Sequence, residues 1–210
     1  MKPIVVVGGG GHAKVLISIL KKMNEFRIIG YTDLKDNGSL LDVCYLGFDS
    51  ALGSLATTIK DLNVILAVGQ VGLGQQRQLL WSRLQSMPVR FPMIVSPGAT
   101  LNEGVSGGEG AVVMDGAVVN TGTSIGRGAI LNTNSTVEHD VVLKDWVHLG
   151  PGSTLSGGVT VGEFSMIGAG ATLIEGTKIA SCCFVGAGAV VVNDLTEPGL
   201  YAGVPARRIK

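Results

Sequence analysis

The second half of the chain repeats with a period of six residues. From Val95 to Val191 every sixth position is aliphatic except Gly107, so sixteen of seventeen positions fit the period without an insertion. The residue two places before each of these positions is usually small, and glycine often follows one place after. A unit this short cannot bury a hydrophobic face alone, but a stack of such units can. The period therefore predicts a parallel β-solenoid.

In this solenoid each six-residue unit is a short strand with a corner, and three units close one coil. The 97 residues of the repeat then make between five and six coils, whose strands pair with the coils above and below. The aliphatic side chain points inward, and the small residue fits where the walls converge. The glycines that follow the aliphatic positions are expected to take the dihedral angles of the corners; they are Gly126, Gly150, Gly162, Gly168 and Gly186. The period does not determine the hand of the coil.

The first ninety residues have a different pattern. Strands are predicted at residues 3–7, 27–31 and 64–68, with a further short one at 89–91, and helices at 12–22 and 73–85. A run of glycines follows the first strand. A strand, a glycine-rich turn, a helix and a second strand are the opening of a Rossmann-like sheet.

The glycine run fits a phosphate-binding turn. Gly8-x-Gly10-x-x-Ala13 follows the dinucleotide pattern, and Asp33 lies 25 residues after Gly8. Bare glycines at a helix N-terminus let a phosphate approach the backbone. About 92 residues leave room for perhaps four strands, so a single nucleotide is favoured over NAD. A glycine turn with no ligand and an ordinary turn role for Asp33 stay open.

Composition excludes several classes of function. Lys plus Arg and Asp plus Glu each number 16, so the chain offers no electrostatic footprint for nucleic acid. No uninterrupted run of about 18 apolar residues occurs, which predicts no membrane span. The three cysteines, Cys44, Cys182 and Cys183, are an odd and unpatterned set that suits buried thiols in a reducing cytoplasm. No motif places Cys182 or Cys183 as a nucleophile.

Three sequence segments carry a family resemblance. GGGGHA at residues 8–13, STVEHD at 135–140 and GVPAR at 203–207, in this order around an uninterrupted hexapeptide repeat, resemble the bacterial sugar acetyltransferases of the PglD/NeuD type. The resemblance covers essentially the whole chain. It implies an α/β plus β-solenoid fold, with a small Rossmann-like N-terminal domain followed by a left-handed parallel β-helix of hexapeptide repeats.

The resemblance also implies a function for each part of the chain and a reaction. Residues 1–92 would bind a nucleotide sugar, residues 93–195 would form the acetyltransferase domain, and the irregular tail 196–210 would lie near the CoA site, with Arg207 or Arg208 near a CoA phosphate. The reaction would be acetyl transfer from acetyl-CoA to an amino group of a UDP-linked 4-amino-deoxy sugar, by direct attack. No metal is expected, and a homotrimer would hold acetyl-CoA in the groove between neighbouring solenoids.

The resemblance assigns a role to the acidic and basic residues of the repeat. His139 corresponds to the general base, and Asp140 to the acid that raises its basicity. An attacking amine must lose a proton, and an imidazole titrates near neutral pH, where a carboxylate partner favours its charged form. Glu138 is a third and weaker candidate for the catalytic group. A surface His-Asp pair without catalytic consequence is the structural alternative.

The resemblance assigns two sets of binding residues as well. The cofactor set is His148, Ala169 and Ala187, the two alanines through their backbone. The nucleotide-sugar set is Gly10, Gly11, His12, Thr32, Asp33 and Gly69. Thr32 stands where the family often has an acid, so the preferred base or sugar stays open.

Other functions remain possible at this stage. One is an O-acetyltransferase of a sialic-acid-like sugar, because the sequence does not decide between nitrogen and oxygen as acceptor. A non-enzyme alternative is a nucleotide-sugar-binding module on a structural solenoid. A zinc-dependent β-helix that hydrates carbon dioxide would need three histidines, and the repeat has only His139 and His148. An NAD-dependent oxidoreductase would leave the solenoid unexplained.

Overall fold

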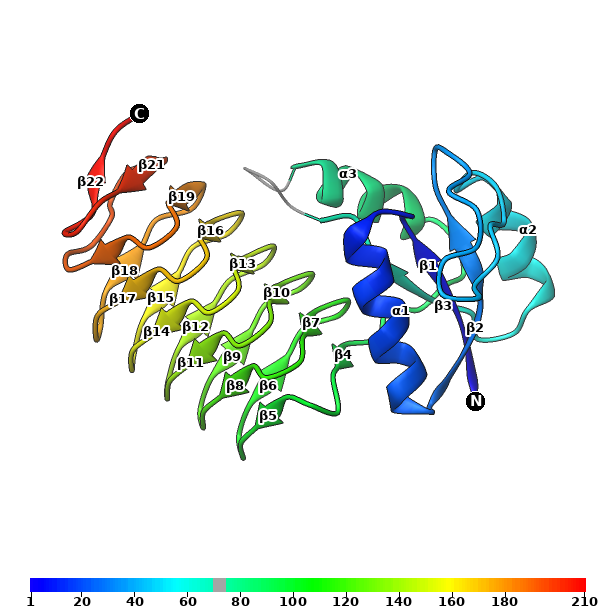
Figure 1. The fold of residues 1–210 in the computed structure, drawn as a ribbon, viewed down its shortest axis with the longest axis horizontal. Helices are drawn as coiled ribbons and strands as arrows, with labels where there is room; N and C mark the ends of the chain where they lie inside the picture. The colour runs from blue at the N-terminus through cyan, green and yellow to red at the C-terminus, as the bar shows by residue number, and fades with distance from the viewer. Residues whose placement is uncertain (70–74) are drawn as a thin grey trace. The chain divides into compact units, whose positions relative to one another are not determined.

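The chain forms two compact units. The computed structural model describes residues 1–69 and 75–210. One unit holds the described residues 1–69 and 75–92, and the other holds residues 93–210. Figure 1 shows the first unit with helices beside a short sheet, and the second as a stack of very short strands. No helix in the described ranges is long and apolar enough to cross a membrane.

The first unit is a small α/β unit. Its elements are β1 (Lys2–Val7), α1 (Gly11–Met23), β2 (Phe26–Thr32), α2 (Ala51–Thr58), β3 (Asn63–Leu66) and α3 (Gln75–Leu84). The three strands are parallel and ordered β2-β1-β3. The central strand is β1, and its residues from Ile4 to Val7 are at most 1% exposed. This burial explains why its sequence is a continuous β-branched run.

Most predicted elements of this unit are confirmed, with shifted ends. The strand predicted at 89–91 is wrong, since Arg90 makes only an isolated bridge to Asn63. The helix α2 was not predicted. The second predicted helix begins at Gln75, and residues 73 and 74 lie outside the described ranges.

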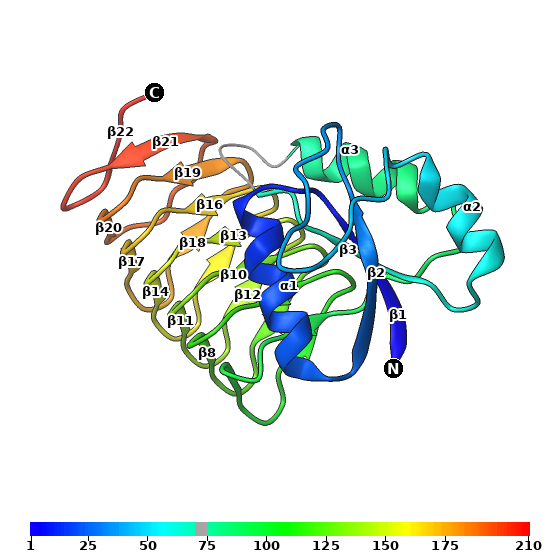
Figure 2. The ribbon, with the colours of Figure 1, turned by 45° about the vertical axis from the view of Figure 1, so that its right-hand side comes forward.

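The second unit is a three-sided parallel β-solenoid. Its strands are β4 (Ile94–Val95), β5 (Thr100–Leu101), β6 (Ser106–Gly107), β7 (Val112–Val113), β8 (Val118–Val119), β9 (Ser124–Ile125), β10 (Ile130–Leu131), β11 (Thr136–Val137), β12 (Val142–Leu143), β13 (His148–Leu149), β14 (Thr154–Leu155), β15 (Thr160–Val161), β16 (Met166–Ile167), β17 (Thr172–Leu173), β18 (Lys178–Ile179), β19 (Cys183–Val185), β20 (Val190–Val191), β21 (Gly199–Ala202) and β22 (Arg207–Arg208). They form an eight-stranded, a six-stranded and a five-stranded sheet. Each strand pairs with the strand one coil on, as Ile130 does with His148. Figures 1 and 2 show these coils stacked one on another.

The core of the solenoid follows the six-residue period. From Val113 onward every aliphatic side chain of the period is at most 4% exposed. The small residues two places earlier also point inward, and several of their hydroxyls donate to nearby carbonyls, as Ser165 Oγ does to Ala180 O at 2.9 Å. Ser135 Oγ is an exception, with no hydrogen-bond partner among the described residues. The predicted fold class, an α/β region followed by a parallel β-solenoid, is confirmed.

The predicted reason for one set of glycines is wrong. The left-handed backbone angles occur three places after the aliphatic residue, for example at Gly128 (φ 62°). Glycines one place after it, such as Gly126, are not among the positive-φ residues. A Cβ on Gly126 would lie 2.4 Å from the Lys144 carbonyl carbon of the next coil. Glycine is therefore used there because the coils approach closely, not because of the backbone angle.

The tail is ordered rather than irregular. β21 pairs in parallel with β19, and β22 pairs antiparallel with β21. The end of the chain thus extends the eight-stranded sheet by two strands, which covers the edge that the last coil would otherwise leave.

Candidate active site

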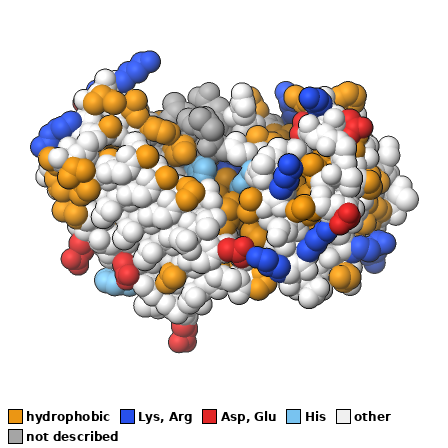
Figure 3. All heavy atoms as spheres, in the orientation of Figure 1, with side chains coloured by type: hydrophobic (Ala, Val, Ile, Leu, Met, Phe, Trp, Pro, Cys, Tyr) orange, Lys and Arg blue, Asp and Glu red, His pale blue; other side chains and the backbone are white. Residues whose placement is uncertain are grey.

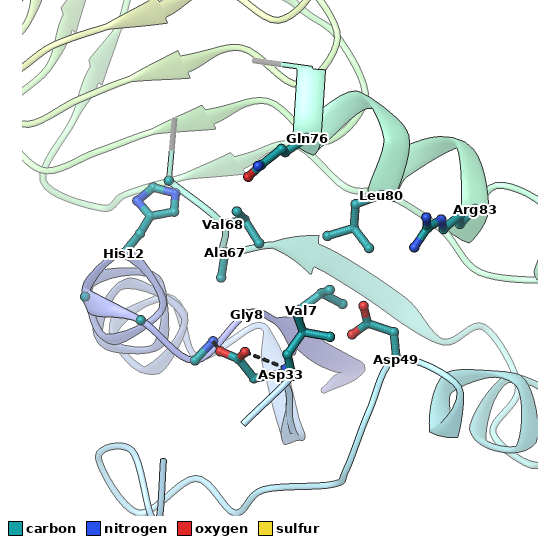
Figure 4. Close-up of a pocket in the computed structure, with 15 residues that line it drawn as sticks. Val7, Gly8, His12, Asp33, Asp49, Ala67, Val68, Gln76, Leu80 and Arg83 are labelled. Carbon is teal, nitrogen blue, oxygen red and sulfur yellow. Dashed lines mark hydrogen bonds between the residues drawn. The ribbon is translucent and has the colours of Figure 1, made fainter. Parts of the chain in front are cut away.

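The predicted site residues lie in three places, one on the α/β unit and two on the solenoid. The first group surrounds a pocket of about 550 Å³ in the α/β unit, at the carboxyl ends of the strands (Figure 4). The pocket is lined by Val7, Gly8, Gly9, Gly10, Gly11, His12, Asp33, Leu34, Asp49, Ala67, Val68, Gly69, Gln76, Leu80 and Arg83. Ligands of open parallel sheets bind at this edge. Five of the six predicted nucleotide-sugar residues line the pocket, and Thr32 does not.

The glycine loop has two differently constrained halves. A Cβ on Gly8, whose φ is 118°, would lie 2.9 Å from the Ala67 carbonyl, and a Cβ on Gly9 would lie 2.7 Å from Asp33 Oδ2. Gly10 and Gly11 have no atom within 4 Å of such a Cβ, and α1 has no side-chain cap. The first half is therefore packed, and the second exposes the helix N-terminus to the pocket. An anion binds well at such an N-terminus.

The carboxylate of Asp33 holds this loop. Its Oδ2 accepts the Gly9 amide, and its Oδ1 accepts the Leu34 amide at 2.6 Å. Both oxygens already accept a hydrogen bond from the backbone, so the first role of Asp33 is to fix the turn.

Thr32 contributes to the pocket indirectly. Its side chain is completely buried, and its Oγ1 donates to Asp49 Oδ1 at 2.7 Å. Asp49 lines the pocket, as do Gln76, Leu80 and Arg83 from α3. The sequence analysis missed these four residues, because Asp49 stands in an irregular segment and α3 carries no recognisable motif.

The second group is the segment Glu138, His139 and Asp140 on the solenoid. It forms the corner between the six-stranded and five-stranded sheets. His139 Nδ1 lies 2.9 Å from Asp140 Oδ2, and the two side chains are 55% and 72% exposed. Asp140 has a φ of 59°, at the corner position that glycine fills in the coils on either side. Few charged side chains lie on the middle coils on the face drawn in Figure 3.

The surroundings of His139 favour its charged form. The hydrogen bond that His139 Nδ1 donates to Asp140 raises the pKa of His139, and the negative charges of Asp140, Glu138 and Glu175 act in the same direction. Partial desolvation opposes them. With Nδ1–H donating to Asp140, Nε2 of the neutral ring is an acceptor. Nε2 has no hydrogen-bond partner among the residues that the structure describes.

The imidazole of His139 lies over Gly157 of the next coil. A Cβ on Gly157 would lie 2.6 Å from both Cε1 and Nε2 of His139. The carbonyl of His139 accepts the Gly158 amide at 2.9 Å. The bare backbone of Gly157 therefore provides the space that the ring occupies.

Glu138 is turned toward the preceding coil. Its Oε2 accepts from Asn120 Nδ2 at 2.8 Å, and Asn120 Oδ1 accepts from Asn102 Nδ2 at 2.5 Å. The carboxylate thus belongs to a ladder of polar side chains along one edge. It acts on His139 through its charge.

The predicted cofactor residues lie elsewhere on the solenoid. His148 is in β13 on the eight-stranded sheet and is 7% exposed, with its Nε2 3.3 Å from Asn132 Nδ2. Ala169 and Ala187 are exposed at the corner between the eight-stranded and six-stranded sheets. His139 lies at the corner between the six-stranded and five-stranded sheets. One chain therefore does not bring these alanines to the same edge as His139.

Comparisons with known proteins give a family match for the first unit and a curated relative of part of the chain. The family model of the PglD N-terminal domain matches residues 3–78. UDP-N-acetylbacillosamine N-acetyltransferase of Bacillus subtilis (strain 168) is 34% identical over 118 residues, which span 54% of this chain and 52% of that protein. The match thus covers about half the length of that curated relative.

Solved structures match over the whole chain. A variant of perosamine N-acetyltransferase from Caulobacter crescentus, in complex with CoA and GDP-perosamine, is 36% identical with a TM-score of 0.93, covering 99% of this chain and 97% of that one. The chain belongs to the PglD-type sugar acetyltransferases. The acetyltransferase domain of PglB from Neisseria gonorrhoeae, in complex with acetyl coenzyme A, is 31% identical with a TM-score of 0.90, covering 99% of each chain. The predicted left-handed β-helix is therefore confirmed for this PglD-type chain.

Residues 1–69 and 75–210 contain no group of three His, Cys, Asp or Glu side chains that could hold a metal ion.

Proposed function

We propose that this PglD-type chain transfers the acetyl group of acetyl-CoA to the amino group of a nucleotide-linked amino sugar. The observation that carries the proposal is the exposed His139–Asp140 pair, with a 2.9 Å hydrogen bond at Nδ1 and an open Nε2. Relatives that bind CoA with GDP-perosamine, or that are named for N-acetylation of a UDP-linked sugar, support it. The UDP-linked 4-amino-deoxy sugar implied by the sequence remains part of the proposal.

The proposed reaction is a direct attack. The sugar amine attacks the thioester carbonyl while His139 Nε2 accepts the amine proton, and Asp140 stabilises the imidazolium that forms. The C–N bond forms, the C–S bond breaks, and the CoA thiolate leaves and takes the proton from His139. Glu138 and Glu175 add negative charge that favours the imidazolium.

An acyl-enzyme on cysteine is not part of this proposal. Burial raises the pKa of Cys183 to about 11, so its thiol stays protonated near neutral pH. The buried sulfur also lies 3.2 Å from the Glu197 carbonyl oxygen.

The proposal divides the work between the two units. Gly10 and Gly11 at the α1 N-terminus would hold the diphosphate of the nucleotide sugar within residues 1–92. Residues 93–195 would carry out acetyl transfer. In the tail, Arg208 is engaged by the Glu197 carboxylate at 2.6 Å and by the Pro198 carbonyl, so exposed Arg207 is the better candidate for a CoA phosphate.

A homotrimer would complete the site. His148, Ala169 and Ala187 lie away from the corner of His139 in one chain, so a CoA molecule that touches both sets needs a second solenoid. Light scattering of the purified protein should give the mass of three chains. A single-chain mass at assay concentration would contradict this part of the proposal.

The activity is tested by thiol release from acetyl-CoA in the presence of UDP-linked and GDP-linked amino sugars. The product should gain one acetyl group by mass, on nitrogen. Acetylation of sugars that carry only hydroxyl groups would favour the O-acetyltransferase alternative. Nucleotide-sugar binding without thiol release from any acceptor would favour the binding module.

The pH dependence of turnover should report the His139–Asp140 pair. The base must be unprotonated, so kcat should rise with pH through the raised pKa of His139. In Asp140→Asn the amide still accepts the Nδ1–H bond but carries no charge. Its kcat profile should therefore have an acidic limb at lower pH and a lower plateau, because the base is weaker. An unchanged limb would show that Asp140 does not act on the catalytic base.

Gly157→Ala should displace the base without unfolding the chain. The new Cβ would meet the far end of the His139 side chain, 2.6 Å from Nε2, and that ring can rotate away at little cost in stability. Misplacing a catalytic group by about 1 Å can reduce turnover by up to about 10²-fold. The assay should show a lower kcat with KM and melting temperature nearly unchanged. A normal kcat would mean that the ring position over Gly157 is not the reactive one.

A further inference from the structure

The pocket of the α/β unit has two chemically different ends. The bare backbone of Gly10 and Gly11 lines one part, and His12 lies near Val68 and Gln76 (Figure 4). Asp49 and Arg83 both lie on the side of the pocket away from His12, with Leu80 between them and His12 in this view. A nucleotide whose diphosphate sits at the α1 N-terminus has its base on one side and its sugar on the other.

Asp49 is fixed by two contacts. Its Oδ1 accepts from the completely buried Thr32 hydroxyl at 2.7 Å, and its carbonyl accepts the Leu52 amide at 3.1 Å at the start of α2. Its Oδ2 has no hydrogen-bond partner among residues 1–69 and 75–210. A rigid carboxylate with an open oxygen in a pocket recognises a donor on a ligand.

Arg83 supplies a cationic hydrogen-bond donor, whereas Asp49 supplies an anionic acceptor. It lies on α3 and lines the same pocket, and the described part of the chain offers its guanidinium no hydrogen bond or ion pair. Leu80, one turn earlier on the helix, and Val7 at the end of β1 add apolar surface to the pocket. This end therefore combines a carboxylate, a guanidinium and apolar side chains.

We infer that Asp49 and Arg83 recognise guanine, so that the nucleotide of the acetyl-accepting sugar is a guanosine diphosphate. This inference rests on the proposed function. The adjacent N1–H and N2–H2 of guanine match a carboxylate, and its O6 and N7 match a guanidinium. Uracil has one donor, N3–H, which lies between two carbonyl oxygens. A carboxylate that accepts N3–H therefore has one of these oxygens, also an acceptor, beside it. Adenine has no N1–H and no O6.

The relatives leave this choice open. One was solved with GDP-perosamine, and another is named for a UDP-linked sugar. The sequence resemblance implied UDP, whereas the carboxylate of Asp49 and the guanidinium of Arg83 favour guanine. Bidentate recognition of this kind discriminates between bases by about 5- to 150-fold.

The test is calorimetric titration of the full-length protein with GDP, IDP, UDP and ADP. GDP should bind at least about tenfold more tightly than the others. IDP differs from GDP only in lacking the N2 amino group. The loss of affinity from GDP to IDP therefore measures the contact of that group with the Asp49 carboxylate.

Two variants and two controls isolate the pair. Asp49→Asn keeps an acceptor for Thr32 but can present an amide NH₂ to guanine, so the preference for GDP over IDP and UDP should disappear. Arg83 is at an exposed helix position, so Arg83→Gln should fold normally. It should weaken the binding of GDP about tenfold or more and the binding of UDP by less. Asp42→Asn and Arg27→Gln change the same residue types outside the pocket and should leave all four affinities unchanged.

Three results would overturn different parts of this inference. Equal affinity for GDP and UDP together with normal acetyl transfer would overturn the guanine assignment alone. A GDP preference that persists in Asp49→Asn and Arg83→Gln would overturn the roles of these two residues. Failure of the wild-type protein to bind any of the nucleotides would contradict the proposed function as well as this inference.

Discussion

Replacing His139 by asparagine should lower kcat by about 10²- to 10⁴-fold, the usual contribution of a general base. Asparagine is similar in size but cannot accept the amine proton. The His139 side chain is 55% exposed and does not belong to the core, so the fold should be unaffected. Thiol release measures kcat, and titration with CoA and with GDP measures binding.

The matched control for this variant is Glu163→Gln. Glu163 is also an exposed, ionisable residue of the solenoid, and it lies at a different corner from His139. It should keep wild-type kcat and the same melting temperature. If His139→Asn turned over as fast as this control, the proton would be removed by another group and the proposed mechanism would be wrong.

Gly162→Ala should destabilise the solenoid by about 3 kcal/mol, at the upper end of the usual cost of overpacking. A Cβ at this position would lie 2.4 Å from the Ser181 amide nitrogen and 2.6 Å from the Ala180 carbonyl carbon. These are backbone atoms, so they cannot move without disturbing the ladder bond from Gly162 N to Ile179 O, which is 2.8 Å long. The melting temperature should fall by roughly 6–12 °C.

Gly170→Ala is the informative comparison for this substitution. Gly170 has a φ of 65°, and no atom lies within 4 Å of a Cβ placed there. Its cost is that of a left-handed alanine, about 1–2 kcal/mol. Thermal unfolding should thus rank Gly162→Ala as the more damaging variant. The reverse order would mean that the close approach of the coils at Gly162 costs less than a left-handed alanine, and the packing explanation for this glycine would be wrong.

The parts of the fold that the sequence predicted are those encoded by local, repeated signals. Each strand of the solenoid pairs with a segment that resembles it 18 residues away, so one period specifies both the strand and its partner. His139 and Asp140 are neighbours in the chain, so their interaction could also be predicted before the structure was known. The buried run of β1 and the glycine loop after it are local signals of the same kind.

The errors occur where the outcome depends on distant partners. Residues 89–91 have strand-like composition, but only a single bridge to Asn63 forms there. The tail appeared irregular because its glycines and prolines break the period, yet β21 finds the open edge of β19. In both cases the free edge of another strand decided the result, and the residues themselves do not encode it.

The sequence by itself determined a three-sided solenoid, a glycine-rich turn before the first helix and an imidazole beside a carboxylate, because each depends on residues that are adjacent or separated by a constant period. Only the tertiary structure showed that Thr32 fixes Asp49, that Arg83 lies at the same end of the pocket, and that Gly157 makes room for His139. Thr32, Asp49 and Arg83 come from segments with no common pattern, and chain folding alone brings them together. The physical reason is that local sequence encodes backbone conformation and burial, whereas the lining of a pocket depends on side chains that meet across long stretches of chain.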